Sequence, residues 1–134
     1  MATAKSTYTY GLGRRKAATA TARLYKGKGN ITINDKPALD YLSGNKTYLA
    51  EITDPLALVS KQKDYDITIL VKGGGLAGQV DAIKLAISKA LTAEAADLRP
   101  VLKKAGFIKR DPREKERKKY GLRSARKKEQ FSKR

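Results

Sequence analysis

The last 29 residues of the chain, 106–134, limit most strongly what it can fold into. They contain 13 basic and 4 acidic residues, a net charge of +9. Their only large apolar or aromatic residues are Phe107, Ile108, Tyr120, Leu122 and Phe131. So few apolar side chains cannot offset the conformational entropy lost when such a segment orders as a globular unit. The sequence therefore predicts an extended basic tail that needs a partner to order it.

Residues 1–105 instead carry the apolar periodicity of a folded domain. They hold 17 basic and 9 acidic residues, a net charge of +8, so that the chain of 134 residues has a charge of +17. This length fits one domain, and a compact object so charged repels itself unless a polyanion neutralises it. We expect a globular domain over 1–105, a tail over 106–134, and nucleic acid as the leading partner ahead of an anionic membrane surface.

The composition also excludes several kinds of chemistry. The chain has no cysteine and no histidine, which removes disulfide frameworks, zinc fingers, thiol chemistry and histidine acid–base chemistry. Residues 1–10 are polar, and no stretch approaches the ~20 apolar residues of a membrane span. No pair of acids or activated nucleophile indicates a reaction. We expect a soluble cytosolic protein that is not an enzyme, with no metal, cofactor or small-molecule substrate.

Alternating or β-branched patterns predict four strands. They cover Thr7–Gly11, Ala17–Tyr25, Ile31–Ile33 and Tyr65–Val71. In the second, small apolar residues from Ala18 to Leu24 alternate with Thr19, Thr21 and Arg23, which is the period of a half-buried strand. Glycine-containing turns at 11–16 and 26–30 separate the first three strands, so the pattern predicts an antiparallel meander.

Helical spacing and capping residues predict the remaining elements. The predicted helices start at Asn34 with Pro37 in the first turn, cover Lys46–Ile52, restart at Asp54, and then cover Leu76–Glu94 and Asp97–Lys104. The helix at 76–94 carries an apolar stripe that should pack on the sheet, and Gly106 ends the last helix. This order indicates a two-layer α/β sandwich with a mixed four-stranded sheet and helices on one face.

The segment Gly73–Gly78 matches the pattern G-x-G-x-x-G between a predicted strand and a predicted helix. A dinucleotide site would also need a second parallel strand ending in an acid about 20 residues further on, and the alanine-rich stretch 93–97 does not resemble one. The glycines could instead serve only a tight turn. We favour a third interpretation, in which exposed amides at the helix N-terminus, beside Lys72, bind an RNA phosphate.

Three further segments combine cations with turns or aromatic residues. Gly11–Lys16 places three consecutive cations on a predicted turn, where a solvated turn is the alternative, and Lys26 with Lys28 is a weaker case. In the tail, the alternating charges after Arg110 suit a solvated helix, but acids nearly vanish from Arg117 on. Aromatic residues among these cations suit stacking on unpaired bases; the alternative is a non-specific solubility or localisation segment.

Several long motifs in register resemble one family, the ninth protein of the small ribosomal subunit in its bacterial or organellar form. They are Gly11–Lys16, Val71–Gln79, Arg110–Arg113, Glu116–Leu122 and Gln130–Arg134. The resemblance spans nearly the whole chain from about Tyr8. Four lysines depart from the residues usual in the family, namely Lys84, Lys89, Lys109 and Lys115.

The resemblance implies binding to the 3′ major, or head, domain of small-subunit ribosomal RNA among neighbouring ribosomal proteins, in the cytoplasm or in an organellar stroma or matrix. It also implies that the tail, which extended could reach ~90 Å, threads through RNA so that Ser132, Lys133 and Arg134 touch peptidyl-site transfer RNA. The expected ribosomal RNA contacts are Arg14, Arg15, Lys16, Lys72, Gly73, Gly74, Gly75, Gln79, Arg110, Arg113, Arg117, Lys118, Lys119, Tyr120, Arg123, Arg126, Lys127 and Lys128.

Two other functions remain as alternatives at this point. A general nucleic-acid compaction protein would also be basic and tailed, but it would bind duplex DNA as well as ribosomal RNA. A small nucleotide-dependent enzyme would use Gly73–Gly78 and would show saturable dinucleotide binding without the tail.

Overall fold

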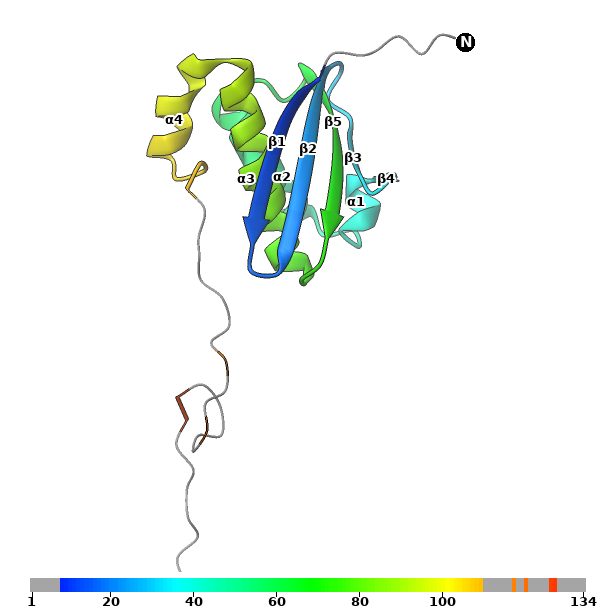
Figure 1. The fold of residues 1–134 in the computed structure, drawn as a ribbon. Coiled ribbons are helices and arrows are strands. Elements are labelled where there is room, and N and C mark those ends of the chain that lie inside the picture. The colour runs from blue at the N-terminus through cyan, green and yellow to red at the C-terminus, as the bar shows by residue number, and fades with distance from the viewer. Residues whose placement is uncertain (1–7, 110–116, 118–119, 121–125, 128–134) are drawn as a thin grey trace, which may run out of the picture.

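A computed structural model describes residues 8–109, 117, 120 and 126–127. Its elements are β1 (Thr9–Arg15), β2 (Ala18–Lys26), β3 (Ile31–Ile33), β4 (Lys36–Pro37), α1 (Ala38–Tyr41), α2 (Lys46–Leu58), β5 (Tyr65–Lys72), α3 (Leu76–Glu94), the 3₁₀ helix η1 (Ala96–Leu98) and α4 (Arg99–Lys104). The strands form one layer, and α2 and α3 form the layer behind it (Figure 1). The predicted two-layer α/β class is confirmed, as are the bounds of the helix at 76–94.

The sheet has the order β1-β2-β5-β3-β4, with β5 antiparallel to β2 and parallel to β3. The predicted meander is therefore wrong after its first hairpin. Strand β5 pairs with β2 over the whole length from Thr19↔Lys72 to Lys26↔Tyr65. A three-residue β3 could satisfy only part of that row of backbone groups, so the longer strand takes the place beside β2.

The sheet contains five strands, one more than predicted, because Lys36 and Pro37 pair with β3. Pro37 was predicted to lie in the first turn of a helix, but the helix begins after it, at Ala38. A proline is tolerated in β4 because that strand lies at the edge of the sheet, where an absent N–H breaks no ladder.

Helix α2 is one continuous helix, although Asp54-Pro55 predicted a break there. Pro55 removes one backbone hydrogen bond, but its ring is buried in the protein interior, and this burial offsets the loss. At the start of the helix, the Asn45 side chain accepts hydrogen bonds from the amides of Thr47 and Tyr48, at 3.0 and 3.2 Å. A capping residue and a buried proline together set the position of α2.

Strand β1 runs through most of the segment that was predicted to be a turn at 11–16, and that prediction is wrong. Gly11 and Gly13 face α3, where a Cβ would lie 2.0 Å from the carbonyl oxygen of Ala86 and 1.9 Å from that of Ala82, respectively. The two glycines therefore allow the backbones of β1 and α3 to touch. The chain reverses later, at Lys16, which has a φ of 53°.

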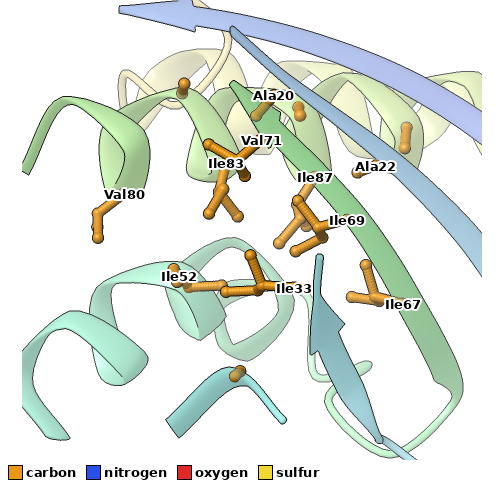
Figure 2. Close-up of a cluster of buried hydrophobic side chains, with 14 of the residues drawn as sticks. Ala20, Ala22, Ile33, Ile52, Ile67, Ile69, Val71, Val80, Ile83 and Ile87 are labelled. Carbon is orange, nitrogen blue, oxygen red and sulfur yellow. The ribbon is translucent and has the colours of Figure 1, made fainter. Parts of the chain in front are cut away.

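The core lies between the sheet and the helices, and its larger members are mostly isoleucines and leucines. Figure 2 shows Ile33, Ile52, Ile69 and Ile83, from four different elements, directed into this shared interior. On the other face of β2, Thr19 and Thr21 are half-buried and Arg23 is exposed. This alternation confirms that the helices cover one face of the sheet.

The last helix of the described chain ends at a glycine, as predicted. Gly106 has a φ of 83°, and its amide donates to the carbonyl of Lys103 at 3.0 Å while that of Phe107 donates to Leu102 at 3.0 Å. Phe107 and Ile108 then pack against the core. Among the described residues, no helix is long and apolar enough to cross a membrane.

Candidate nucleic-acid interface

Two basic, glycine-containing segments that are far apart in the sequence meet at one end of the sheet. A Cβ on Gly73 would lie 2.6 Å from the carbonyl oxygen of Ala17, and a Cβ on Gly74 would lie 3.0 Å from the Cβ of Ala18. The turn between β1 and β2 therefore rests on the turn between β5 and α3, at the lower end of the sheet in Figure 1. We call this place the basic end of the sheet and define it by residues 14–17 and 72–75.

Two strands present a cation each here, in one row across the strand between them. Arg14 pairs with Thr19, and Thr19 pairs with Lys72. Neighbouring strands are about 4.8 Å apart, so the backbones of the two cationic residues are about 10 Å apart and their side chains share a face. Both residues are exposed, and Lys16 adds a third exposed cation from the turn. The row is on the face of the sheet opposite the helices.

Arg15 has a different environment from its neighbours, because consecutive residues of a strand point to opposite faces. Its side chain is only 14% exposed, and its Nε lies 3.5 Å from an oxygen of Asp81 on α3. The expectation that 14–16 lie together on a turn is therefore wrong, because Arg14 and Arg15 belong to β1. Arg14 and Lys16 are available to a partner, while Arg15 joins the strand to the helix.

The turn before α3 has the exposure that an anion site needs. Gly73 and Gly74 have positive φ values of 75° and 69°. Gly75 is the N-cap of α3, and a Cβ built on it would meet no described residue within 4 Å apart from its chain neighbours. The first amides of a helix have no partner within the helix and lie at its positive end. After α3 the described chain continues with η1 and α4, so the parallel strand required by a dinucleotide site does not follow.

Two side chains hold this turn in place. The Gln79 amide donates to the carbonyl of Gly73 at 3.0 Å and accepts from the Tyr41 hydroxyl at 2.8 Å. Asn34 donates to the carbonyl of Val71 at 3.1 Å and accepts from its amide at 2.9 Å. Gln79 was expected to contact RNA, but both polar groups of its side chain are engaged within the protein. No local pattern indicates the roles of Tyr41 and Asn34, which only the fold brings to this turn.

The turn at 26–30, which was the weaker candidate, is already filled by an anion of the protein itself. One carboxylate oxygen of Asp66 accepts hydrogen bonds from the amides of Lys28, Gly29 and Asn30, at 2.9, 3.1 and 3.0 Å. These hydrogen bonds, first that from the Asn30 amide and next that from the Lys28 amide, hold the pKa of Asp66 below its usual range. This turn can therefore offer a nucleic acid only its lysine side chains.

Four predicted contacts in the tail fall on described residues. Arg117, Tyr120, Arg126 and Lys127 are all exposed, and Tyr120 is 101% exposed. The other tail predictions lie outside the described residues; they are Arg110, Arg113, Lys118, Lys119, Arg123, Lys128, Ser132, Lys133 and Arg134.

Comparison with known proteins connects the basic end of the sheet and the tail to one family. The sequence model of ribosomal protein S9/S16 matches residues 13–134 and so includes both regions. The chain belongs to this family. It is therefore a ribosomal protein of the small-subunit type, a structural constituent of the ribosome and not an enzyme. Its location is the ribosome, of the cytoplasm or of an organelle.

Individual members of the family are similar over the whole chain. Small ribosomal subunit protein uS9 of Synechococcus sp. (strain CC9311) is 48% identical over 100% of both chains. The uS9c protein of Emiliania huxleyi is 48% identical over 96% of this chain and 99% of its own. The uS9 protein of Prochlorococcus marinus (strain MIT 9313) is 50% identical over 93% of each. These relatives confirm the predicted bacterial or organellar type.

Proposed function

We propose that the chain docks on the head domain of small-subunit ribosomal RNA through the basic end of its sheet. The observation that carries this proposal is the convergence of Arg14, Lys16 and Lys72 on the turn that exposes the first amides of α3. Cations and helix N-termini bind phosphate oxygens without reading base sequence. Such contacts fix the position of a protein on folded RNA, as a structural constituent of the ribosome requires.

We further propose a division of labour between residues 1–105, which dock, and residues 106–134, which lie along RNA and carry Ser132–Arg134 to peptidyl-site transfer RNA. The tail has a net charge of +9, and the exposed ring of Tyr120 is available to stack on a base or ribose. The expectation for the last three residues comes from the family resemblance, because their charge alone indicates only a polyanion.

The docking proposal is tested by removing the two cations of the sheet row. In the full chain, Arg14→Gln with Lys72→Gln should weaken binding to complete small-subunit ribosomal RNA and make the salt dependence shallower. Each lost phosphate contact should lower the slope of log affinity against log salt by about 0.7 to 0.9. Arg99→Gln with Lys63→Gln is the matched control, because both residues are exposed and follow or precede the ends of α3 and β5 that are far from the basic end.

Equal slopes for the two double variants would contradict docking through this end of the sheet. A competition with duplex DNA at fixed salt tests the alternative of a general compaction protein. We expect ribosomal RNA to be preferred, and equal affinity for the two nucleic acids would count against a specific ribosomal RNA site.

The proposed transfer RNA contact is tested by deleting residues 132–134. The shortened chain should still enter the small subunit, because the cations of the domain and of the rest of the tail remain. Binding of transfer RNA at the peptidyl site of the assembled subunit should weaken, as measured by filter retention. If incorporation into the subunit were lost instead, the end of the tail would be an assembly element.

A further inference from the structure

A pocket of about 350 Å³ lies beside β1, where the chain leaves α4. Strand β1 is at the edge of the sheet, and the walls come from β1, from α3 and from residues 105–109. Residues that carry the argument are Arg14, Asp81, Lys84, Leu85, Phe107 and Lys109. The pocket thus joins the folded domain to the first residues of the proposed tail.

The wall formed by the start of the tail is held in a fixed position. Hydrogen bonds from the amides of Gly106 and Phe107 end α4, and Phe107 packs against the core. The ammonium of Lys84 lies 5.7 Å from the centroid of the Phe107 ring, within the range of a cation–π contact. Lys109 follows two residues later, on the rim. The pocket is therefore formed before any ligand arrives.

The charge of the pocket favours an anion. Asp81 is the one acid among its described lining residues, and it pairs with Arg15 at 3.5 Å. Arg14, Lys84 and Lys109 add three positive charges to the same walls. Leu85 and Phe107 supply apolar surface next to these cations. A cationic rim with an apolar wall matches a nucleotide, which carries a phosphate at one end and a flat ring system at the other.

We propose that this pocket holds a single nucleotide of ribosomal RNA and thereby fixes the direction in which the tail leaves the domain. The phosphate would contact Lys84 and Lys109, and the base or ribose would lie against Phe107 and Leu85. The volume is at the small end of ligand pockets, so it admits one nucleotide and excludes a duplex. An acidic side chain from a neighbouring protein would satisfy the cations but leave the apolar wall uncovered. The proposal rests on the proposed ribosomal RNA binding.

The first test uses Lys84→Gln with Lys109→Gln in the full chain, neither of which belongs to the basic end of the sheet. Lys103→Gln with Lys104→Gln is the matched control, because these exposed lysines of α4 do not line the pocket. Bound to complete small-subunit ribosomal RNA, the pocket variant should lose hydroxyl-radical protection at one short RNA segment. The slope of its salt dependence should also fall by about one unit. The control should keep both.

A second variant separates the apolar wall from the charge. Phe107→Leu should weaken protection of the same segment while leaving the salt slope unchanged, because no cation is lost. Thermal unfolding of each variant shows that the fold is intact. Unchanged protection in both pocket variants would overturn the proposal. If Arg14→Gln with Lys72→Gln still weakened binding in that case, only the pocket would have failed and docking would stand.

A third test identifies the occupant directly. The chain has no cysteine, so Ala105→Cys gives a single attachment point for a photo-crosslinker at the wall of the pocket. In assembled small subunits it should crosslink to the RNA segment that the pocket protects. An adduct only to another protein would overturn the proposal. Ala57→Cys, at an exposed position on α2, is the control and should give no adduct to those nucleotides.

Discussion

The glycines of β1 and those of the turn between β5 and α3 are required for different physical reasons. Gly11 and Gly13 are buried, and their missing side chains allow the backbone of α3 to touch the strand. Gly73 and Gly74 are exposed and have positive φ values. Glycine therefore serves helix packing in the first segment and backbone conformation in the second.

This difference decides how each segment can meet a phosphate. In β1 the backbone packs against α3 at Gly11 and Gly13, so these glycines offer no amide to a ligand and side chains such as Arg14 must make the contact. In the turn, Gly75 has open space around it, so backbone amides can take part directly. The two segments should therefore respond differently when a methyl group is added to each glycine.

The largest effect is expected for Gly13→Ala. A Cβ there would lie 1.9 Å from the carbonyl oxygen of Ala82 and 2.6 Å from the amide nitrogen of Ala86, both backbone atoms of α3. Helix and strand would have to separate, so the free energy of unfolding should fall by about 3 kcal/mol. Urea denaturation measures this change.

Gly44→Ala is the control for this variant, because Gly44 has a positive φ of 76° but open space around its Cβ position. It should cost about 1 kcal/mol, from the backbone conformation alone. If the two variants lost the same free energy of unfolding, the close contact between β1 and α3 would be disproved.

An intermediate effect is expected for Gly74→Ala. Its φ of 69° is unfavourable for alanine, and a Cβ would meet the Cβ and amide of Ala18 at 3.0 Å, so the free energy of unfolding should fall by about 1 to 2 kcal/mol. Gly75→Ala should cost less, about 0.5 kcal/mol, because only a favourable N-cap residue is replaced. If Gly74→Ala and Gly75→Ala lost the same free energy of unfolding in urea denaturation, the positive φ would not be the reason for glycine at position 74.

The parts of the fold that could be predicted are those with long local patterns. Leu76–Glu94 has an uninterrupted apolar stripe, and its bounds are confirmed. The glycines of β1 suggested a turn, because their actual cause, contact with Ala82 and Ala86, lies far along the chain. The insertion of β5 beside β2 is also decided by pairing over long distances, which no local pattern contains.

The candidate site shows the same division. The cations and the exposed glycine turn could be predicted because charge and glycine content are local properties. That Arg14 and Lys72 share one row depends on the strand order, and that Arg15 points away depends on recognising 9–15 as a strand. The pocket beside β1 forms only where three segments come together, so it could not be predicted from the lysines at 84 and 109.

The turn at 26–30 also contains glycines, but its amides already hold an anion. The Asp66 carboxylate accepts three amides there, and a Cβ on Gly27 would lie 2.1 Å from one of its oxygens. Glycine at 27 thus makes room for the carboxylate, whereas the turn at 73–75 has open space at Gly75, where we propose that an external phosphate binds.

The smallest effect is expected for Asp66→Asn, because the carboxylate lies near solvent. Its pKa is lowered in the folded chain by the bonds from Asn30 and Lys28, so its ionised form stabilises the fold above the unfolded-state pKa of about 4. That contribution is lost as the pH falls through the folded-state pKa. The difference in unfolding midpoint between wild type and variant should therefore be present at pH 6 and should vanish on acidification. Asp97→Asn is the control, because it removes one exposed charge. If the difference in midpoint between wild type and Asp66→Asn stayed constant with pH, the negative charge of Asp66 would not be what stabilises this turn.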